Sequence, residues 1–466
     1  MDIEACTVPT GSSITDVMQA IDRASTGLAV VVDSSGTLTG VVSDGDLRRA
    51  LVAGAGLDDA VDRYMVREVL VLPEGFSPGQ RDALFEQPAF STRAPRWIPL
   101  VDAEGRPRNL VRSAEIATAS SVGLSLGRAA EHRPALVTVL GGAGYIGSVL
   151  VRQLLAEGYR VRVVDRLFYG RASVDELVHH PRFELVEADV RSLSSLVPAL
   201  VDSDAVVHLA ELVGDPLCAH NPLMTFEINY LATASIALAC HYLQINRFVY
   251  VSSCSVYGAS PEPETILTED SPLRPVSLYA KLKIESERSI RQLTHGGFSP
   301  VILRLGTVFG LSYRPRFDLV VNTFTAQAIH DGSIVVFGGD QWRPHIHVSD
   351  VAGAIRRCLR LPLEVVGGQT FNLVAENLTV DELANLVADE VPTATVTRSA
   401  TVVDRRNYRV SADKARRMLG FSPERTVRDG IREIAAALRA GVIANHTDPR
   451  YSNIRAFTAA EMGAAL

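Results

Sequence analysis

The middle of the chain alternates short apolar runs with segments of helical periodicity. An apolar run at residues 135–140 meets a glycine turn at residues 141–147, and in the segment that follows, apolar residues such as Leu150 and Leu154 recur at helical spacing. A second apolar run ends on Asp165. This order predicts a strand, a tight turn, a helix and another strand, which together make a βαβ unit of about thirty residues.

The alternation continues beyond this unit. Further strand-like runs lie at residues 183–186, 205–209, 247–251 and 301–305. Strands that alternate with helices predict an α/β fold built on a doubly wound parallel sheet. From Gln369 onward the pattern predicts a strand and helices that complete a smaller C-terminal substrate lobe, and residues 446–466 predict a peripheral or partner-contacting tail.

The first 120 residues hold an internal repeat. Residues 31–46 align with residues 100–115 at a constant offset of 69 residues. Matched positions include Asp33 with Asp102 and Gly36 with Gly105. Each copy predicts a strand, a glycine turn, a second strand and a helix, so we expect an α+β module of two similar halves. Residues 121–134 have little pattern and predict a linker.

Composition narrows the class of protein. A length of 466 residues with 47% hydrophobic residues predicts two or three domains with packed cores. No apolar run reaches the roughly eighteen residues of a membrane span, and the N-terminus lacks the pattern of a signal peptide. The five cysteines are scattered, as expected of a reduced cytoplasm, and a net charge of -7 argues against a nucleic-acid partner. We therefore expect a cytoplasmic protein without a membrane or nucleic-acid partner.

The glycine turn predicts a dinucleotide site. Its first glycine allows the sharp turn, the second lets a pyrophosphate approach the backbone, and the third lets the helix pack closely. Asp165 is placed to accept hydrogen bonds from ribose hydroxyls, and its charge disfavours a 2′-phosphate, so NAD is favoured over NADP. Arg166 weakens this preference slightly. The turn residues that we expect to contact the cofactor are Gly141, Gly144, Tyr145, Ile146 and Gly147.

The ends of two further strands predict additional cofactor contacts. In such sheets ligands bind at the carboxyl ends of the strands. Asp189 and Val190 follow one strand, and Leu209 and Ala210 end another. We expect Asp189 to accept a hydrogen bond from the adenine amino group, with a helix N-cap before Ser192 as its structural alternative.

Three residues predict acid–base chemistry. Tyr279 and Lys283 are four residues apart and share one helix face. A neighbouring ammonium and a positive nicotinamide ring both favour the phenolate, so Tyr279 is the predicted base, and Lys283 would also hold the nicotinamide ribose. Lys281 should face elsewhere. Ser253 follows a central strand and could hydrogen-bond the same substrate oxygen as Tyr279, although such a serine is alternatively only a turn former.

The motifs that carry these residues resemble those of a known family. GGAGYIG, HLA, SSCSVYG, YAKLK, LRLGTVFG and QWRPHIHVSDVA are similar, in order and spacing, to the extended short-chain dehydrogenase/reductase family of NAD-dependent nucleotide-sugar epimerases and dehydratases. The resemblance covers residues 136–440. It implies a Rossmann-type catalytic domain at residues 135–445, NAD as cofactor, a nucleotide-diphosphate sugar as substrate, a homodimer or higher homo-oligomer, and catalytic positions for Ser253, Tyr279 and Lys283.

Two departures from the family bear on the reaction. The 4,6-dehydratases carry an acidic pair directly after the catalytic threonine, and Cys254 and Ser255 stand at those positions here. Neither suits the acid–base steps of water loss, so a dehydratase is disfavoured. Thr307 stands where the family often has asparagine near the sugar diphosphate, which leaves the sugar and the nucleotide open.

Three residues near the C-terminal lobe complete the predicted site. Arg343 matches a family arginine near the ligand phosphates, and its alternative is a surface arginine. Together with Ser253 and Thr307 it is expected to bind substrate. His345 and His347 share a strand face with no third ligand nearby, so we predict structural roles for them and no metal site.

The first copy of the N-terminal repeat, which ends GVVSDGDLRRAL, resembles the CBS domain. In that family two copies pair into one adenine-nucleotide-binding module, and the resemblance covers residues 1–120. It implies that Ser43 and Asp46 hold an adenosine ribose. The second copy has Arg112 and Glu115 at the matching positions, so a regulatory nucleotide sensor and a structural or dimerising module both stay open.

The leading functional hypothesis is an NAD-dependent nucleotide-sugar epimerase. Tyr279 would remove a proton from a sugar hydroxyl, which we place at C4, and a transient 4-keto sugar would regain its hydride on the other face. The alternatives are a net NAD(P)-dependent dehydrogenase or ketoreductase that releases the keto sugar, and an NAD-bound sensor without catalysis. The intact Ser253, Tyr279 and Lys283 argue against the sensor.

Overall fold

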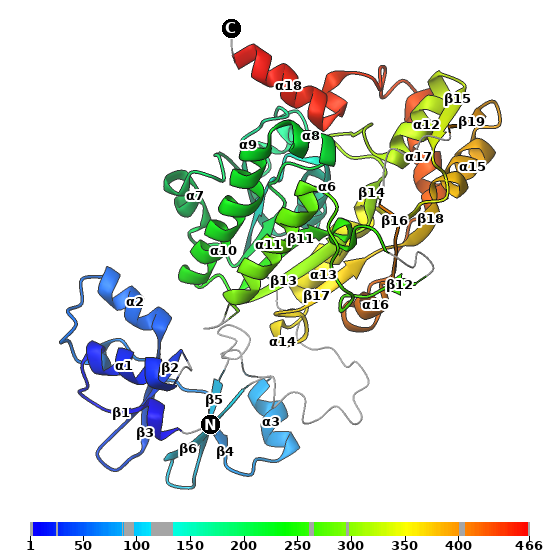
Figure 1. Cartoon of the computed structure of the whole chain (residues 1–466). Coiled ribbons are helices and arrows are strands. Elements are labelled where there is room, and N and C mark those ends of the chain that lie inside the picture. Colours follow the sequence, from blue (N-terminus) through cyan, green and yellow to red (C-terminus); the bar gives the residue numbers. More distant parts are fainter. Residues whose placement is uncertain are drawn as a thin grey trace. The chain divides into compact units, whose positions relative to one another are not determined.

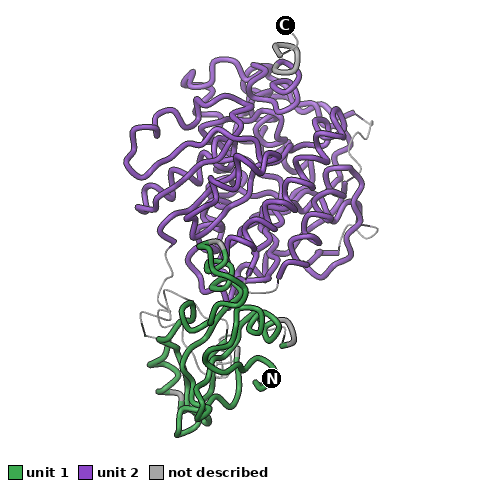
Figure 2. Tube along the Cα trace, turned by 90° about the vertical axis from the view of Figure 1, so that its left-hand side faces the viewer, with its two compact units in different colours: residues 1–132, 295–297 green, residues 133–294, 298–466 purple. Residues whose placement is uncertain are grey.

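The computed structural model describes residues 3–464 except 25–26, 86, 88–96, 113–133, 261–264, 295–297 and 400–405. The chain divides into two compact units, residues 1–132 and residues 133–294 with 298–466 (Figure 2), which are taken separately below. The predicted linker at residues 121–134 lies outside the described residues, apart from its last residue.

Unit 1 contains two three-stranded sheets with the same pairing pattern. In each sheet the first two strands are parallel and the second and third are antiparallel, and the antiparallel ladder shifts its register once, at Val31/Val32 and at Leu100/Val101. The strands are β1 (Thr7–Pro9), β2 (Leu28–Val32), β3 (Leu38–Ser43), β4 (Leu72–Pro73), β5 (Trp97–Val101) and β6 (Pro107–Arg112). The internal repeat predicted from the sequence is confirmed. The helix predicted after the second copy, with Glu115, lies outside the described residues.

Three helices accompany these sheets in unit 1. They are α1 (Ile14–Ala24), α2 (Asp44–Val52) and α3 (Pro78–Phe85), and the short 3-10 turns are η1 (Glu4–Cys6) and η2 (Val61–Arg63). Ile14 and Val17 of α1 and Leu47 of α2 are buried with Val31 and Val42 of the first sheet. Unit 1 therefore has its own hydrophobic core.

Unit 2 is built on seven parallel strands in the order β17-β13-β11-β10-β7-β8-β9 (Figure 1). Their bounds are β7 (Leu136–Leu140), β8 (Arg160–Asp165), β9 (Phe183–Glu187), β10 (Ala205–His208), β11 (Arg247–Ser253), β13 (Ser299–Leu305) and β17 (Thr370–Leu373). The strand order reverses between β7 and β10, where such sheets bind ligands. The predicted Rossmann-type doubly wound sheet is confirmed.

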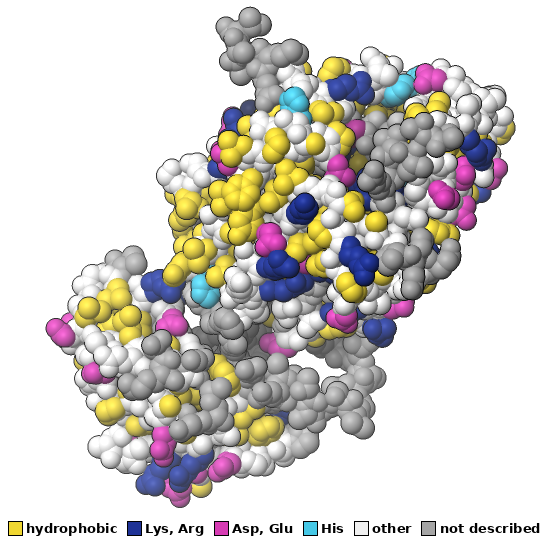
Figure 3. All heavy atoms as spheres, viewed as in Figure 1, with side chains coloured by type: hydrophobic (Ala, Val, Ile, Leu, Met, Phe, Trp, Pro, Cys, Tyr) yellow, Lys and Arg dark blue, Asp and Glu magenta, His cyan; other side chains and the backbone are white. Residues whose placement is uncertain are grey.

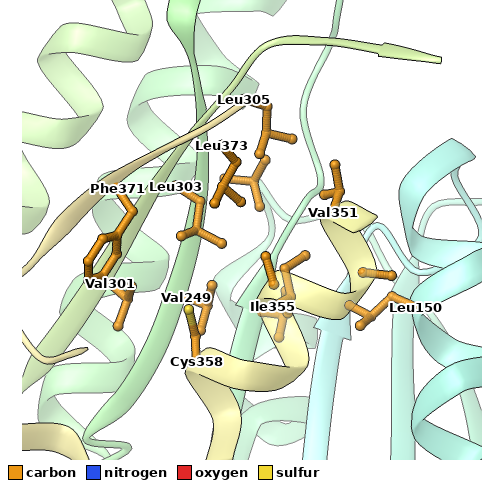
Figure 4. Close-up of a cluster of buried hydrophobic side chains, with 14 of the residues drawn as sticks. Leu150, Val249, Val301, Leu303, Leu305, Val351, Ile355, Cys358, Phe371 and Leu373 are labelled. Carbon is orange, nitrogen blue, oxygen red and sulfur yellow. The ribbon is translucent and has the colours of Figure 1, made fainter. Parts of the chain in front are cut away.

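Helices cover both faces of this sheet, which is why its strands read as continuous apolar runs. One face carries α6 (Tyr145–Ala156) and α13 (Val348–Arg360), and the other carries α7 (Leu193–Leu200), α10 (Thr233–Tyr242) and α11 (Leu278–Gln292). Figure 4 shows Val351 and Ile355 of α13 between Leu150 of α6 and the sheet residues Val249 and Leu303. Shorter elements are η3 (Asp175–Leu177), α8 (Asp215–His220), η5 (Cys254–Tyr257) and α14 (Leu363–Val366).

One long helical stretch of unit 2 is unusually apolar. Helix α9 (Pro222–Phe226), the π-helical turn η4 (Glu227–Ala232) and α10 run on without a break, and by length and composition alone Pro222–Tyr242 could cross a membrane. Its polar residues are nevertheless used inside unit 2: Asn229 is buried and hydrogen-bonds both backbone groups of Leu212. Exposed apolar side chains gather on this face of unit 2 (Figure 3), namely Leu223, Phe226, Leu231, Leu238 and Tyr242.

The C-terminal lobe of unit 2 consists of small sheets and helices around a separate core, in which Phe309 and Ile431 are fully buried. Its strands are β12 (Ile266–Leu267) with β20 (Arg409–Val410), β14 (Thr307–Phe309) with β16 (Trp342–His347) and β18 (Glu376–Thr379), and β15 (Ser333–Phe337) with β19 (Thr395–Ser399). Its helices are α12 (Val320–His330), α15 (Val380–Glu390), α16 (Asp413–Leu419) and α17 (Val427–Arg439).

The last described segment is not peripheral. After the turn η6 (Pro449–Tyr451), helix α18 (Asn453–Ala464) lies beside α8 (Figure 1). Phe457 is fully buried and stacks on Phe168 with ring centroids 4.8 Å apart, and Asn453 is also buried. The expectation of a peripheral tail is wrong for these residues, because the short segment 446–466 gains its helix from tertiary packing rather than from its own periodicity.

Candidate active site

A cavity of about 570 Å³ lies at the carboxyl ends of the central strands of unit 2, between the sheet and the C-terminal lobe. A volume of this size suits a small-molecule ligand. The predicted site residues that line it are Gly141, Gly144, Tyr145, Ile146, Gly147, Leu209, Ser253, Tyr279, Lys283, Thr307 and Arg343. The structure thus brings the glycine turn, the Tyr/Lys pair and the predicted substrate contacts to one place. Asp165, Asp189, Val190 and Ala210 do not line this cavity.

The glycine turn has the close backbone contacts that its sequence predicts. Gly141 has a φ of +82°, and a Cβ there would lie 2.7 Å from the backbone nitrogen of Ala210. A Cβ on Gly147 would lie 2.6 Å from the Cα of Gly142. Helix α6 begins at Tyr145, and no described side chain caps its first N–H groups. The turn therefore leaves a backbone cradle with free donors, which fits the pyrophosphate of a dinucleotide.

The two predicted adenosine contacts differ in their surroundings. Asp165 accepts hydrogen bonds from the backbone N–H groups of Ala143 (3.0 Å) and Leu167 (2.8 Å), so it is fixed beside the glycine turn. Burial raises the pKa of Asp165, and these two N–H groups oppose that rise. Asp189, in contrast, forms ion pairs with Arg191 (2.7 Å) and Arg166 (3.1 Å). These two partners were not anticipated from the sequence, and an adenine amino group would have to share the carboxylate with them.

The predicted acid–base residues come together from β11 and α11. Ser277 caps the N-terminus of α11, and the helix then places Tyr279 and Lys283 on its buried face, whereas Lys281 is exposed as predicted. The Lys283 ammonium donates a 2.5 Å hydrogen bond to the carbonyl of Val251 on β11. Ser253 ends the same strand. The side chains of Ser253 and Tyr279 both line the cavity. The geometry can therefore hold one substrate oxygen between two hydroxyl groups.

Glu211 is a site residue that the sequence analysis missed. Its buried carboxylate forms an ion pair with Lys283, and it accepts a 2.8 Å hydrogen bond from the hydroxyl of Tyr250. Burial raises the pKa of Tyr279 well above its usual value, and the negative charge of Glu211 raises it further. In this structure the lysine charge is thus offset, contrary to the simple expectation that it lowers the tyrosine pKa. The available signal was an acidic residue directly after the HLA motif, at the end of β10.

We expect Glu211→Gln to move the rising limb of the pH–rate profile to lower pH. As the predicted base, Tyr279 would act only in its deprotonated form, and the other acidic groups that raise its pKa, Asp215 and Cys218, stay unchanged in this variant. Removing the negative charge of Glu211 leaves the Lys283 ammonium to favour the phenolate, so the pKa of Tyr279 falls. The pH dependence of kcat measures this shift. An unchanged or alkaline-shifted limb would contradict the assigned electrostatic role.

A buried ion pair fixes α11 against the sheet. Arg304 on β13 donates to both carboxylate oxygens of Glu287 on α11, at 3.0 and 2.7 Å. Ser252, next to Ser253, donates to the same carboxylate at 2.6 Å. Glu287 and Arg304 are almost completely buried. This network sets the position of α11, and hence of Tyr279, relative to the end of β11.

The structure also gives the burial and the hydrogen-bond partners of Cys254, Arg343 and His347. Cys254 is buried with its thiol on the carbonyl of Arg304, and burial raises its pKa. Arg343 is buried and donates to the backbone carbonyl of Trp342 at 2.8 Å, so it is not a surface arginine. His347 accepts a hydrogen bond from the backbone N–H of Ser349 and contacts Glu433, which fits its predicted structural role. Within the described part of the chain, no group of three or more His, Cys, Asp or Glu side chains could hold a metal ion.

The predicted nucleotide contacts of unit 1 lie together. Ser43 caps α2, and Asp46 accepts hydrogen bonds from both the backbone N–H (2.8 Å) and the hydroxyl (2.6 Å) of Ser43. The other carboxylate oxygen of Asp46 pairs with Arg49 at 2.6 Å. The two residues thus form a capping box, which stabilises the helix start whether or not a nucleotide binds.

Both parts of the chain match known families. Residues 137–373 match the family described as NAD dependent epimerase/dehydratase, and residues 1–53 match the CBS domain. UDP-glucuronic acid decarboxylase 2 of Arabidopsis thaliana is 31% identical over 352 residues, which cover 72% of this chain and 74% of that protein. UDP-glucose 4-epimerase of Mycolicibacterium smegmatis is 30% identical over 308 residues, which cover 63% of this chain and 95% of that protein.

Solved structures share the fold of unit 2. The structure of MoeE5 in complex with UDP-glucuronic acid and NAD matches with a TM-score of 0.57 and 28% sequence identity. The match covers 65% of this chain and 99% of MoeE5.

Proposed function

The chain belongs to the NAD-dependent epimerase/dehydratase family, and on that premise we propose that it is a nucleotide-sugar epimerase that acts through a transient 4-keto sugar. The observation that carries this proposal is the cavity that Ser253, Tyr279 and Lys283 share with the glycine turn. The cofactor is NAD. The glycine turn and Asp165 would hold it, because the turn offers free backbone donors and Asp165 is fixed beside the turn.

In this proposal each residue of the site has a separate role. The chemistry that NAD supplies when bound is reversible hydride transfer. Tyr279 takes the proton from the sugar hydroxyl and later returns it, and Ser253 hydrogen-bonds the same oxygen as it becomes a carbonyl. Lys283 is positioned by Val251 and Glu211, and the carboxylate of Glu211 offsets its charge, so its main role would be to hold the nicotinamide ribose. Thr307 and Arg343 line the cavity on its lobe side, where we place the sugar diphosphate.

The residues after Ser253 support an epimerase over a dehydratase. Water loss needs a second acid and base near the sugar, and Cys254 and Ser255 supply neither. The thiol of Cys254 points to a backbone carbonyl in the core. Ser255 is buried and lines the cavity, and its hydroxyl has no hydrogen-bond partner among the described residues, so it is available to a sugar hydroxyl. A hydroxyl can orient the sugar but cannot act as the missing acid.

A second candidate is a UDP-glucuronic acid decarboxylase, because proteins of that name are 30–32% identical to this chain. One assay separates the two candidates. The enzyme is incubated with UDP-glucose, UDP-galactose or UDP-glucuronic acid without added cofactor, and the products are followed by NMR and mass spectrometry. An epimer of unchanged mass supports the proposal. Loss of carbon dioxide or loss of water would instead identify a decarboxylase or a dehydratase. A net loss of two hydrogens that occurs only after NAD is added would identify a dehydrogenase.

A regulatory role for the N-terminal module stays a prediction. The CBS match and the adjacency of Ser43 and Asp46 support binding of an adenine nucleotide. Titration of the full chain with AMP and ATP, followed by calorimetry and by activity, tests it. Absence of both binding and any change in rate would leave the module a structural or dimerising role.

Self-association also stays a prediction. The exposed apolar side chains of α9, η4 and α10 support a face that a second copy of the chain would cover. Analytical ultracentrifugation of the wild type and of Leu238→Asp tests this. A wild-type monomer at micromolar concentration would contradict a dimer on this face.

A further inference from the structure

Arg314 is a buried cation whose donors are mostly unused. It is 7% exposed, and it lies in the loop between β14 and α12. Its Nη1 donates a 2.5 Å hydrogen bond to the side-chain carbonyl of Asn453, but its Nε and Nη2 have no hydrogen-bond partner within the described part of the chain. Burial and the nearby charge of Arg316 lower the pKa of Arg314 to about 10, so it still carries its charge at neutral pH. A buried arginine with two idle donors is costly unless a ligand satisfies them.

The neighbouring charges do not satisfy Arg314. Asp318 is the nearby carboxylate on the same loop, and it is engaged by Arg316 at 2.8 Å and by the backbone N–H of Asn453 at 2.8 Å. Arg314 and Arg316 both line the cavity described above. Arg316 is therefore neutralised within the protein. The charge of Asp165 also acts on Arg314, but its carboxylate accepts hydrogen bonds from the backbone N–H groups of Ala143 and Leu167, so the two idle donors of Arg314 remain for a further anion.

The position of Arg314 indicates which anion it faces. Its guanidinium lies 4.0 Å from the ring centroid of Tyr169, in the loop that follows β8 and Asp165, and both residues line the same cavity as the glycine turn. Arg343, in contrast, lies on β16 in the C-terminal lobe, where we place the sugar nucleotide. Arg314 thus sits on the cofactor side of the cavity.

Helix α18 holds this arginine in place. Asn453 is 5% exposed, and besides accepting from Arg314 it donates through its side chain to the carbonyl of Val213 at 3.0 Å. One turn further along, Phe457 anchors the helix by stacking on Phe168, which directly precedes Tyr169. The start of α18 therefore spans from the loop after β10 to the loop after β8, on both sides of the glycine turn.

We propose that Arg314, positioned by Asn453 of α18, binds the diphosphate of the dinucleotide, and that α18 acts as a strap that retains the cofactor between turnovers. The inference rests on the proposed function, because an epimerase must keep its cofactor whereas a net oxidoreductase must exchange it. A guanidinium fork matches two phosphate oxygens, and the two idle donors, Nε and Nη2, present such a fork.

The test measures cofactor retention rather than activity. The variants are Arg314→Met, Arg314→Lys and Asn453→Ala, and the matched control is Arg455→Met, which truncates an exposed arginine of the same helix. NAD bound per chain is counted by mass spectrometry after prolonged dialysis, and the dissociation rate of NAD is measured by chasing with excess unlabelled cofactor. Circular dichroism verifies that each variant is folded.

We expect Arg314→Met and Asn453→Ala to release NAD about ten- to a hundred-fold faster than the wild type, which is what a charge-assisted hydrogen bond is usually worth. Arg314→Lys should accelerate the release of NAD less than Arg314→Met does, and Arg455→Met should release NAD at the wild-type rate. If Arg314→Met does not fold, the Arg314→Lys and Asn453→Ala variants still decide the question by the same measurement.

Unchanged retention of NAD in the Arg314 and Asn453 variants would overturn the proposal. If the binding of UDP is weakened in the same variants, the arginine belongs to the diphosphate of the sugar nucleotide instead. A wild type that carries no NAD would count against the proposed epimerase, and the proposal about Arg314 would then be decided by NAD titration of the same variants.

Discussion

Replacing Tyr279 by phenylalanine is expected to remove nearly all turnover, by about 10²- to 10⁴-fold, while NAD remains bound. The phenol is buried at 9% exposure in the cavity, next to Ser253 at the end of β11. Lys283 and Glu211, which line the same cavity, are paired with each other, and Asp215, which also lines it, is paired with Arg406 at 3.3 Å. The variant keeps the ring, so the packing of α11 should not change.

The measurement is kcat with the nucleotide sugar identified by the product assay, together with the NAD content of each protein. Tyr313→Phe is the matched control, because that tyrosine is 55% exposed. Lys283→Met and Lys281→Met form a second pair, in which only the loss of the buried lysine should impair turnover. Near-normal activity of Tyr279→Phe would remove the proposed mechanism.

Replacing Glu287 by glutamine is expected to destabilise unit 2 by about 3–5 kcal/mol. The change leaves the guanidinium of Arg304 buried without its carboxylate, and Ser252 loses its charged acceptor. Breaking one side of a buried ion pair costs more than the pair contributes, because the remaining charge stays desolvated. The substitution should therefore lower the urea concentration at the unfolding midpoint of unit 2.

A neighbouring ion pair gives the control. Glu285 also lies on α11 and pairs with Arg288, but both side chains are largely exposed. Glu285→Gln should therefore change the free energy of unfolding by less than about 1 kcal/mol. Unfolding is followed by the fluorescence of Trp342 in a Trp97→Phe background, so that unit 2 alone is observed. If Glu287→Gln and Glu285→Gln changed the free energy of unfolding equally, the buried ion pair would not stabilise unit 2 more than the exposed one.

The parts of the site that the sequence predicted are those fixed by local geometry. The glycine turn constrains a few consecutive residues, so the pattern of residues was enough to assign Gly141 and Gly147. Tyr279 and Lys283 lie one helical turn apart, so their spacing predicted that they share a helix face. Ser253 was predicted from its position directly after a strand. The alternation of strands and helices likewise determined the parallel sheet, because each apolar run is short and bounded by helical segments.

The parts that could not be predicted depend on tertiary contacts. Glu211 becomes important only because β10 and α11 bring it to Lys283, and a glutamate after a strand has many ordinary roles. Arg314 and Asn453 are far apart in the sequence, and neither belongs to a periodic pattern. The same holds for α18, whose weak helical periodicity gave no sign that Phe457 would be buried on Phe168. The periodicity of a short segment does not indicate which residues, distant in the sequence, will pack against it in the folded chain.

An epimerase that keeps its cofactor through the catalytic cycle should still carry that cofactor after purification. The protein is prepared without added nucleotide and denatured by heat, and the released small molecules are quantified by mass spectrometry. We expect about one NAD per chain, because a cofactor that is reduced and reoxidised within one cycle has no need to leave. A protein that releases no NAD and binds NAD or NADP only weakly and reversibly would contradict it and would favour a net dehydrogenase or reductase.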